Sequence, residues 1–167
     1  MVAPLEEYYA KYDEAAKDPS LLETFWSEWG NSRETACRNM RCYDQYQECG
    51  YTDEPQFDKY GWLCNDVPAA DIEVVKLFGE EPLISTVECL QLPNGKWVSG
   101  SHWHLSLTGR ACGCSIWSRQ HDTRINALIY EMRQLIDIIK RDKVKKDEAH
   151  IPDIVHAMDN VRQLSLF

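Results

Sequence analysis

The sequence predicts an α+β fold, in which a helical N-terminal half precedes an antiparallel β-meander and a long amphipathic helix. Apolar residues recur at helical spacing up to about Gly50, whereas the period shortens after Asp71 and turn residues separate the apolar runs. A long stripe at i, i+3 and i+4 spacing then follows Asp122. Since 44% of the 167 residues are hydrophobic, the chain has enough apolar surface for a folded core.

The same changes of pattern predict how the chain is organised. We expect one domain over residues 1–161, with an acidic helical part (1–70) and a part that holds the meander and the later helices (71–161). A short tail, 162–167, follows.

Three helices are predicted in the first part. Residues 5–17 have apolar side chains at helical spacing, and Asp18-Pro19-Ser20 ends this helix and caps the next. The second helix ends at Gly30-Asn31, and Ser32 begins a third, which ends near Gly50. The segment from Tyr51 to Ala70 has no clear period, and we expect an irregular segment anchored by three aromatic residues, Phe57, Tyr60 and Trp62.

Strands are predicted from Leu83 onwards. Residues 83–92 and 96–107 flank Pro93-Asn94-Gly95, the strongest hairpin signal in the chain, and residues 111–117 form the third strand of the meander. The alternation places one set of side chains on a common face: Trp97, Ser99, Ser101, Trp103, Leu105 and Leu107. Residues 71–78 fit either a short strand or a turn of helix.

A long helix is predicted next, with Asp122 as its cap. Its apolar stripe packs on the sheet and comprises Ile125, Leu128, Ile129, Met132, Leu135, Ile136 and Ile139. Residues 140–148 are expected to be a solvated charged run, and Pro152 begins a short C-terminal helix. A helix, three strands and a long helix over about 71–140 resemble the order of elements in double-stranded RNA-binding domains. The basic helix start of that family is missing, so the resemblance is topological only.

The charge is divided unevenly along the chain. Residues 1–82 hold 18 acidic and 7 basic residues, a net charge of −11, whereas residues 83–167 have a net charge of +2. Direct binding of DNA by the N-terminal half is therefore not expected. The acidic half is either an ordinary solvated surface or a surface presented to a basic nucleic-acid-binding protein, such as a nuclease.

The composition also indicates a location in the cell. No apolar stretch is long enough to span a membrane and no signal peptide is recognisable, so we expect a soluble protein in the cytoplasm. The seven cysteines are interpreted as mostly reduced thiols buried as small apolar side chains.

The tail carries the most specific motif. Its last five residues, Gln163, Leu164, Ser165, Leu166 and Phe167, resemble the peptide with which bacterial proteins bind the β sliding clamp, five positions out of five. The resemblance implies an extended peptide in a preformed groove. In it, Gln163 would hydrogen-bond at the rim and Leu164 would lie between subsites, while Ser165 faces outward and Leu166 and Phe167 fill the apolar pocket.

Chance is a poor explanation for this motif. Average residue usage gives such a pentapeptide on the order of once in a few hundred thousand trials at a chosen position. The alternative is that the apolar residues of the tail fold back onto the protein's own core. The position after a predicted helix and at the end of the chain favours docking to a partner.

A second candidate site is a set of imidazoles and thiols in the meander. His102 and His104 form one pair, and Cys112 and Cys114 form the other. Residues two apart on a strand share a face, so both pairs could converge on a tetrahedral zinc ion. The alternative is that the spacing only reflects strand alternation, and in that case the protein has no cofactor.

The sequence gives no motif for catalysis. No P-loop, GxGxxG or HExxH motif occurs, and the paired carboxylates lie in exposed acidic segments. The aromatic clusters are expected to be core rather than platforms for base stacking, because they lack basic neighbours. Lys140 to Lys146 is the one basic cluster where contact with phosphate is plausible.

These patterns predict a function in protein binding. We expect a non-enzymatic bacterial or bacteriophage protein that binds the sliding clamp through its tail and engages or inhibits a second partner at DNA. One alternative is an acidic DNA mimic that inhibits host defence, as anti-CRISPR and anti-restriction proteins do. The other is a small thiol or zinc enzyme.

Overall fold

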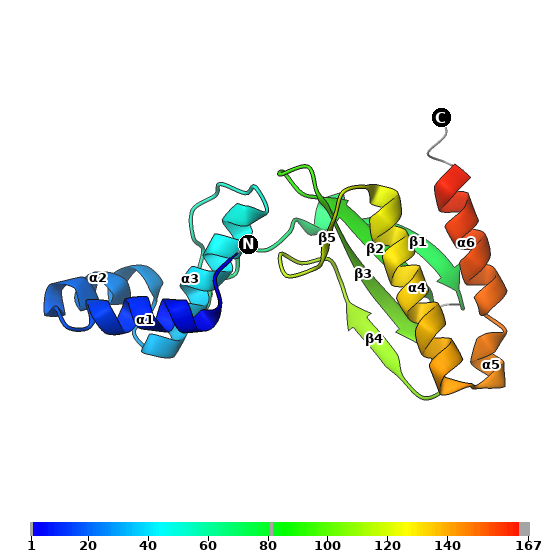
Figure 1. The fold of residues 1–167 in the computed structure, drawn as a ribbon, viewed down its shortest axis with the longest axis horizontal. Coiled ribbons are helices and arrows are strands. Elements are labelled where there is room, and N and C mark those ends of the chain that lie inside the picture. The colour runs from blue at the N-terminus through cyan, green and yellow to red at the C-terminus, as the bar shows by residue number, and fades with distance from the viewer. Residues whose placement is uncertain (1, 81, 164–167) are drawn as a thin grey trace. The chain divides into compact units, whose positions relative to one another are not determined.

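The computed structural model describes residues 2–80 and 82–163 and confirms the α+β fold (Figure 1). The chain forms two compact units, residues 1–66 and 67–167. The first unit is entirely helical apart from its irregular last segment, and the second contains the sheet and the later helices.

Three helices form the first unit. They are α1 (Leu5–Ala15), α2 (Pro19–Trp29) and α3 (Arg33–Glu48). Both expected caps are present, since the Asp18 side chain accepts a hydrogen bond from the amide of Ser20, and Ser32 accepts one from Thr35. One buried cluster of this unit contains Tyr8, Tyr12, Ala36 and Cys37 with partly buried neighbours, and Ala15, Tyr46 and Cys49 are buried as well.

The segment after α3 differs from the expectation. None of the three aromatic residues expected to anchor it is fully buried, since Phe57, Tyr60 and Trp62 are 40%, 72% and 42% exposed, although the Phe57 ring packs edge-on against Trp29 with 6.4 Å between the ring centroids. Buried Asn39 ties the segment down instead: its amide nitrogen donates to the carbonyls of Trp29 and Gly61, both at 2.8 Å, and its oxygen accepts from the Leu63 amide at 3.0 Å. One buried polar side chain therefore satisfies two backbone groups of the irregular segment and one at the end of α2.

The second unit is built on an antiparallel sheet in the order β1-β2-β3-β4, with β5 also pairing with β3. The strands are β1 (Glu73–Phe78), β2 (Ser85–Gln91), β3 (Trp97–His104), β4 (Gly109–Cys112) and β5 (Gln120–His121), and a single 3-10 turn, η1 (Ala69–Asp71), precedes them. The meander is confirmed. No full helix precedes the strands in the described part of this unit, so the order of elements departs from that of double-stranded RNA-binding domains.

The hairpin between β2 and β3 forms where the turn residues predict it. The Gly95 amide donates to the carbonyl of Leu92 at 2.9 Å, and the Leu92 amide donates to the carbonyl of Lys96 at 2.8 Å. Gly95 has a φ of +83°, a conformation that a residue with a side chain rarely adopts.

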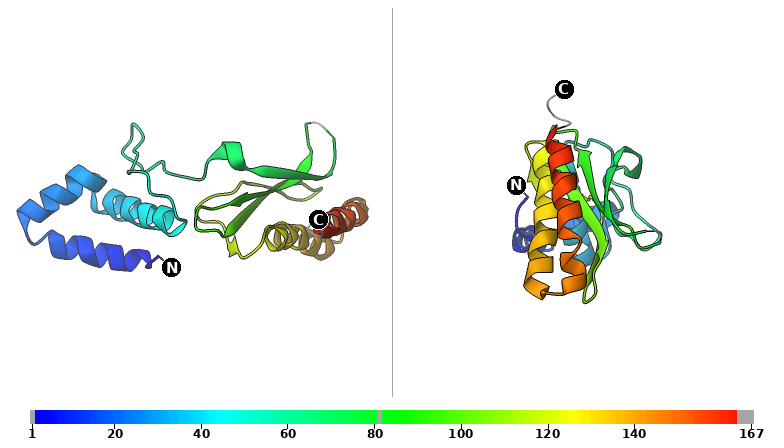
Figure 2. Two further views of the ribbon diagram at one scale, coloured as in Figure 1. Left: turned by 90° about the horizontal axis from the view of Figure 1, so that it is seen from above. Right: turned by 90° about the vertical axis from the view of Figure 1, so that its right-hand side faces the viewer.

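Helices cover one face of this sheet (Figure 2). They are α4 (Arg124–Asp142), α5 (Lys145–Glu148) and α6 (Ile151–Gln163); α4 lies against β2 and β3, and α6 lies against α4 and β1. The predicted apolar stripe of α4 is confirmed, and it forms the centre of the largest core with Val87, Cys89, Trp103, Ile154 and Met158.

Two details at the ends of α4 correct the sequence analysis. The N-cap is Thr123, whose hydroxyl accepts from the Asn126 amide at 3.2 Å, whereas Asp122 forms an ion pair with Lys96 at 2.5 Å. The charged run after α4 is not wholly solvated, because Asp147 is only 4% exposed and accepts hydrogen bonds from the amide and the hydroxyl of Ser106.

Candidate functional sites

The first candidate site is the end of α6. Ile154, Met158 and Val161 bury one face of this helix in the main core, which fixes the helix to its unit. The helix runs through Arg162 and Gln163, the first two residues of the expected tail, and both are exposed. Gln163 is therefore accessible at the end of an anchored helix. The other four residues of the motif, Leu164 to Phe167, lie outside the described residues.

The structure does not bring the four candidate zinc ligands together. His102 is opposite Ala111 and His104 is opposite Gly109, whereas Cys112 is opposite Ser101. Directly opposed residues of an antiparallel pair share a face, so Cys112 lies on the other face of the sheet from both histidines. Cys114 is buried, with its thiol 3.8 Å from the carbonyl of Val98. Within residues 2–80 and 82–163, no group of three or more His, Cys, Asp or Glu side chains could hold a metal ion.

His102 has a different neighbour. Its Nε2 lies 3.2 Å from a carboxylate oxygen of Glu88 on the adjacent strand. Gly113 passes beside this pair, since a Cβ at Gly113 would lie 3.3 Å from a Glu88 oxygen. The thiols nearest to the sheet interior are poor nucleophiles, because burial raises the pKa of Cys89 and of Cys114 to about 12. The described residues thus give no support to a thiol nucleophile paired with a histidine.

A buried polar network joins α4 to the sheet. Glu131 is 4% exposed, and its carboxylate accepts a hydrogen bond from the Ser101 hydroxyl at 3.0 Å. Arg110 of β4 reaches the same oxygen at 3.3 Å. Sequence reasoning missed this network, although two serines on the inward face of β3 were a signal that a polar group lies opposite them. All the polar partners come from within the unit, so we interpret the network as structural.

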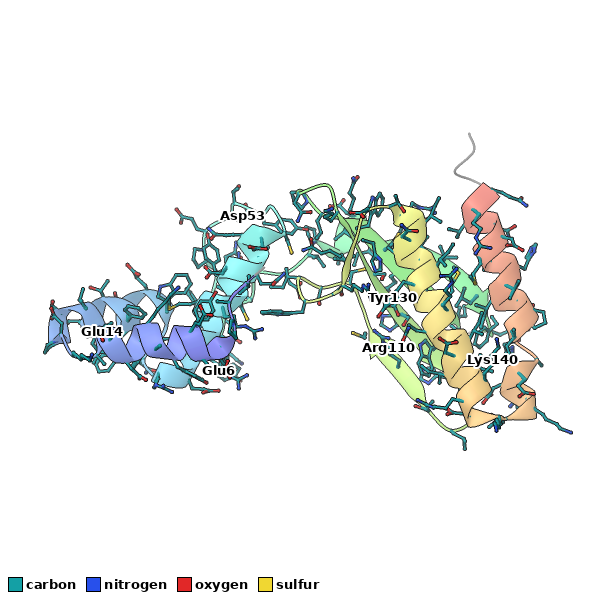
Figure 3. The ribbon with its side chains drawn as sticks, viewed as in Figure 1. Glu6, Glu14, Asp53, Arg110, Tyr130 and Lys140 are labelled. Atoms are coloured by element: carbon teal, nitrogen blue, oxygen red, sulfur yellow. The ribbon has the colours of Figure 1, made fainter. Side chains whose placement is uncertain are left out.

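The second candidate site is a groove beside α4. Its volume is about 560 Å³, and its described lining residues come from the β5 segment, α4 and α6: Arg119, His121, Ile125, Asn126, Ile129, Tyr130, Arg133, Gln134, Asp137 and Arg162. The guanidinium of Arg119 lies 5.0 Å from the centroid of the Tyr130 ring, and the His121 ring lies 5.1 Å from the same centroid. Figure 3 shows Tyr130 on α4.

The charge of this groove is predominantly positive. Three arginines line it, and Asp137 is the one carboxylate among its described lining residues. Burial and the neighbouring Arg119 lower the pKa of His121, so the imidazole is neutral near pH 7. His121 Nε2 is buried and has no hydrogen-bond partner in the described part of the chain. No local pattern predicts this groove, because its arginines are distant from one another along the chain.

The third candidate surface is the acidic exterior of the first unit. Residues 1–66 contain 14 acidic and 6 basic residues, a net charge of −8. Ion pairs join Lys17 to Glu14, Arg33 to Asp13 and Arg38 to Glu34. Other carboxylates are exposed, among them Glu6, Glu7, Glu23, Glu28 and Glu54. The surface is therefore strongly negative, with several carboxylates available to a basic partner.

Comparison with known proteins adds no family. No protein-family model, curated protein or solved structure matches the chain. Among the described residues, no helix has the length and apolar character needed to cross a membrane.

Proposed function

We propose that this is a non-enzymatic bacterial or bacteriophage protein that binds the β sliding clamp through Gln163 to Phe167. The observation that carries the proposal is the five-for-five match of these residues to the clamp-binding peptide. Gln163, the residue that would fix the register of the peptide, is exposed at the end of α6. The protein would act in the cytoplasm of the bacterial cell, where the clamp encircles DNA.

Docking of the tail on the clamp requires only a small structural change in the rest of the protein. The apolar face of α6 is buried, so the helix stays in place, and only its last turn must open for Gln163 to join an extended peptide. Terminal turns of helices fray readily, because their last carbonyls lack intrahelical partners. Leu166 and Phe167 would then supply most of the binding energy as two buried anchors.

The test is a direct titration of purified clamp with the full chain. The double substitution Leu166→Ala, Phe167→Ala should weaken binding by about 100-fold or more, because each anchor is worth about 2 kcal/mol. Gln163→Ala should weaken binding less, by about tenfold, through loss of one amide hydrogen bond at the rim. Isothermal titration calorimetry measures all three affinities.

Val155→Ala is the matched control. Val155 is an apolar residue of α6 that is 43% exposed and lies outside the motif, so its loss should leave the affinity unchanged. The proposal fails if the unsubstituted protein does not bind the clamp, or if the double variant binds as tightly as the unsubstituted protein.

The second part of the proposal concerns the acidic unit. We propose that residues 1–66 engage or inhibit a basic nucleic-acid-binding protein, such as a nuclease, and their net charge of −8 favours this. A DNA mimic without clamp binding is the second candidate function. It predicts that DNA competes for the basic partner and that binding falls steeply as salt rises, with the Leu166→Ala, Phe167→Ala variant as active as the parent.

A further inference from the structure

We propose that the groove beside α4 binds the phosphate groups of a nucleotide, either free or within single-stranded nucleic acid. Arg119 directly precedes β5, Arg133 lies on α4 and Arg162 lies on α6, and all three line this groove of one folded unit. Guanidinium is the side-chain group best matched to phosphate, because its N–H donors form a planar fork that fits two oxygens at once. This site lies outside the acidic unit and adjoins the clamp motif, because Arg162 directly precedes Gln163, but none of its described lining residues belongs to the motif.

The contacts of the three arginines leave each of them able to bind an anion. Arg133 is exposed and has no ion pair with another described residue. Arg119 lies over the Tyr130 ring, a contact that orients a guanidinium while leaving its charge in place. Arg162 forms an ion pair with Asp159, but both side chains are about half exposed, so a phosphate could compete for this guanidinium.

The surroundings favour a negatively charged occupant. Asp137 is the single carboxylate among the described lining residues, against three arginines, so the groove keeps a positive charge. The positive charge of Arg119 also contributes, after burial, to the lowered pKa of His121, because it disfavours a further positive charge beside it. Asn126 and Gln134 line the groove as well and add amide groups that can donate to phosphate oxygens or to a sugar or base.

The groove differs from the basic cluster that the sequence suggested. Lys140 and Arg141 lie near the C-terminal end of α4, where Arg141 is paired with Asp142, and Lys145 and Lys146 lie on α5. The three lysines are exposed. A cluster of this kind attracts phosphates without a shaped site. The groove instead combines a concave surface with arginines from three segments of the chain, an arrangement that can position a bound anion.

The experiment titrates the full chain with three probes: pyrophosphate, ATP and a ten-nucleotide oligo(dT). Calorimetry at low and moderate salt gives the affinities, and amide chemical shifts report where each probe binds. We expect shifts at Arg119, Tyr130 and Arg133. Pyrophosphate and ATP binding would identify a free ligand, whereas binding of oligo(dT) alone would identify a nucleic-acid backbone.

Arg133→Gln and Arg119→Gln should each weaken binding by about tenfold or more, because each removes charge-assisted hydrogen bonds to the anion. Arg141→Gln is the matched control, since it makes the same charge change on an exposed position of α4 outside the groove. The Leu166→Ala, Phe167→Ala variant should bind all probes normally, which separates this result from the clamp experiment.

Three results would overturn the proposal. One is that no probe binds at low salt. Another is that Arg141→Gln weakens binding as much as Arg133→Gln does, which would indicate general charge attraction. The third is that the chemical shifts change only at Lys140 to Lys146. Arg133 is exposed and its substitution is not expected to disturb folding, so this variant remains decisive if Arg119→Gln proves unstable.

Discussion

The two units of this protein are held together in different ways. The second unit has a continuous aliphatic core, in which Leu128, Met132, Leu135 and Ile139 of α4 are at most 1% exposed. The first unit has a small core based on tyrosines, and its middle helix, α2, has no buried residue. Aliphatic burial therefore dominates one unit, whereas the other depends more heavily on aromatic and polar contacts.

The polar contacts of the first unit also change how its acidity should be interpreted. The Tyr8 hydroxyl donates to Asp44 at 2.5 Å, and the Tyr46 hydroxyl donates to Asp53 at 2.8 Å. The guanidinium of Arg33 donates a hydrogen bond to Asp13, and this bond keeps the pKa of Asp13 below its usual value. Part of the negative charge thus supports the fold, whereas exposed carboxylates such as Glu6, Glu7 and Glu23 can meet a basic partner.

The largest expected effect is in the aliphatic core. Leu128→Ala should lower the free energy of unfolding of the second unit by about 2–5 kcal/mol, because it removes a fully buried side chain and leaves a cavity between α4 and the sheet. Urea denaturation followed by segment-resolved hydrogen exchange measures this loss. Gln134→Ala, an exposed change on the same helix, should stay within about 0.5 kcal/mol. An equal loss of protection in α1 and α3 would show that the two units do not unfold separately.

A polar substitution gives the corresponding test of the first unit. Asn39→Ala should cost about 2 kcal/mol or more, because the carbonyls of Trp29 and Gly61 and the amide of Leu63 lose their partner. Hydrogen exchange should be fastest in the segment from Glu54 to Asn65. Gln47→Ala on the same helix is the control, since Gln47 is exposed. Unchanged protection of the Leu63 amide would mean that other contacts hold this segment.

Much of the fold could be predicted because its signals are local. The stripe of α4, the hairpin at Pro93-Asn94-Gly95 and the caps at Asp18 and Ser32 all depend on residues close together in the chain. The irregular segment after α3 could not be predicted in the same way. Its order depends on Asn39, a polar residue within α3 whose burial only the tertiary structure reveals.

The candidate sites also differ in whether they depend on neighbouring residues of the chain or on the tertiary structure. The clamp motif is five consecutive residues, so the sequence alone suggests it, and it stays a prediction. The expected zinc site depended on strand register, and the register puts Cys112 and His102 on opposite faces. The arginine groove was missed because Arg119, Arg133 and Arg162 meet only when β5, α4 and α6 are packed together.

The smallest expected effect concerns the helix caps, a device that both units share. Ser32→Ala in the first unit and Thr123→Ala in the second should each cost about 1 kcal/mol, because each hydroxyl accepts a hydrogen bond from an amide that has no intrahelical partner. Chemical denaturation of each variant measures the loss. Thr123→Ser keeps the hydroxyl and should retain most of the stability that Thr123→Ala loses.

Asp122→Ala distinguishes the cap in the structure from the cap that the sequence suggested. Asp122 pairs with Lys96, but its side chain is 80% exposed, so the loss should be below about 0.5 kcal/mol. If Asp122→Ala proves more damaging than Thr123→Ala, then Asp122 caps α4 in solution, and the helix begins one residue earlier than described. A larger loss of stability for Thr123→Ala than for Asp122→Ala would instead show that Thr123 caps the helix. The reason would be its β-region backbone, with φ of −137° and ψ of 152°, which lets its side chain and not that of Asp122 reach the first turn.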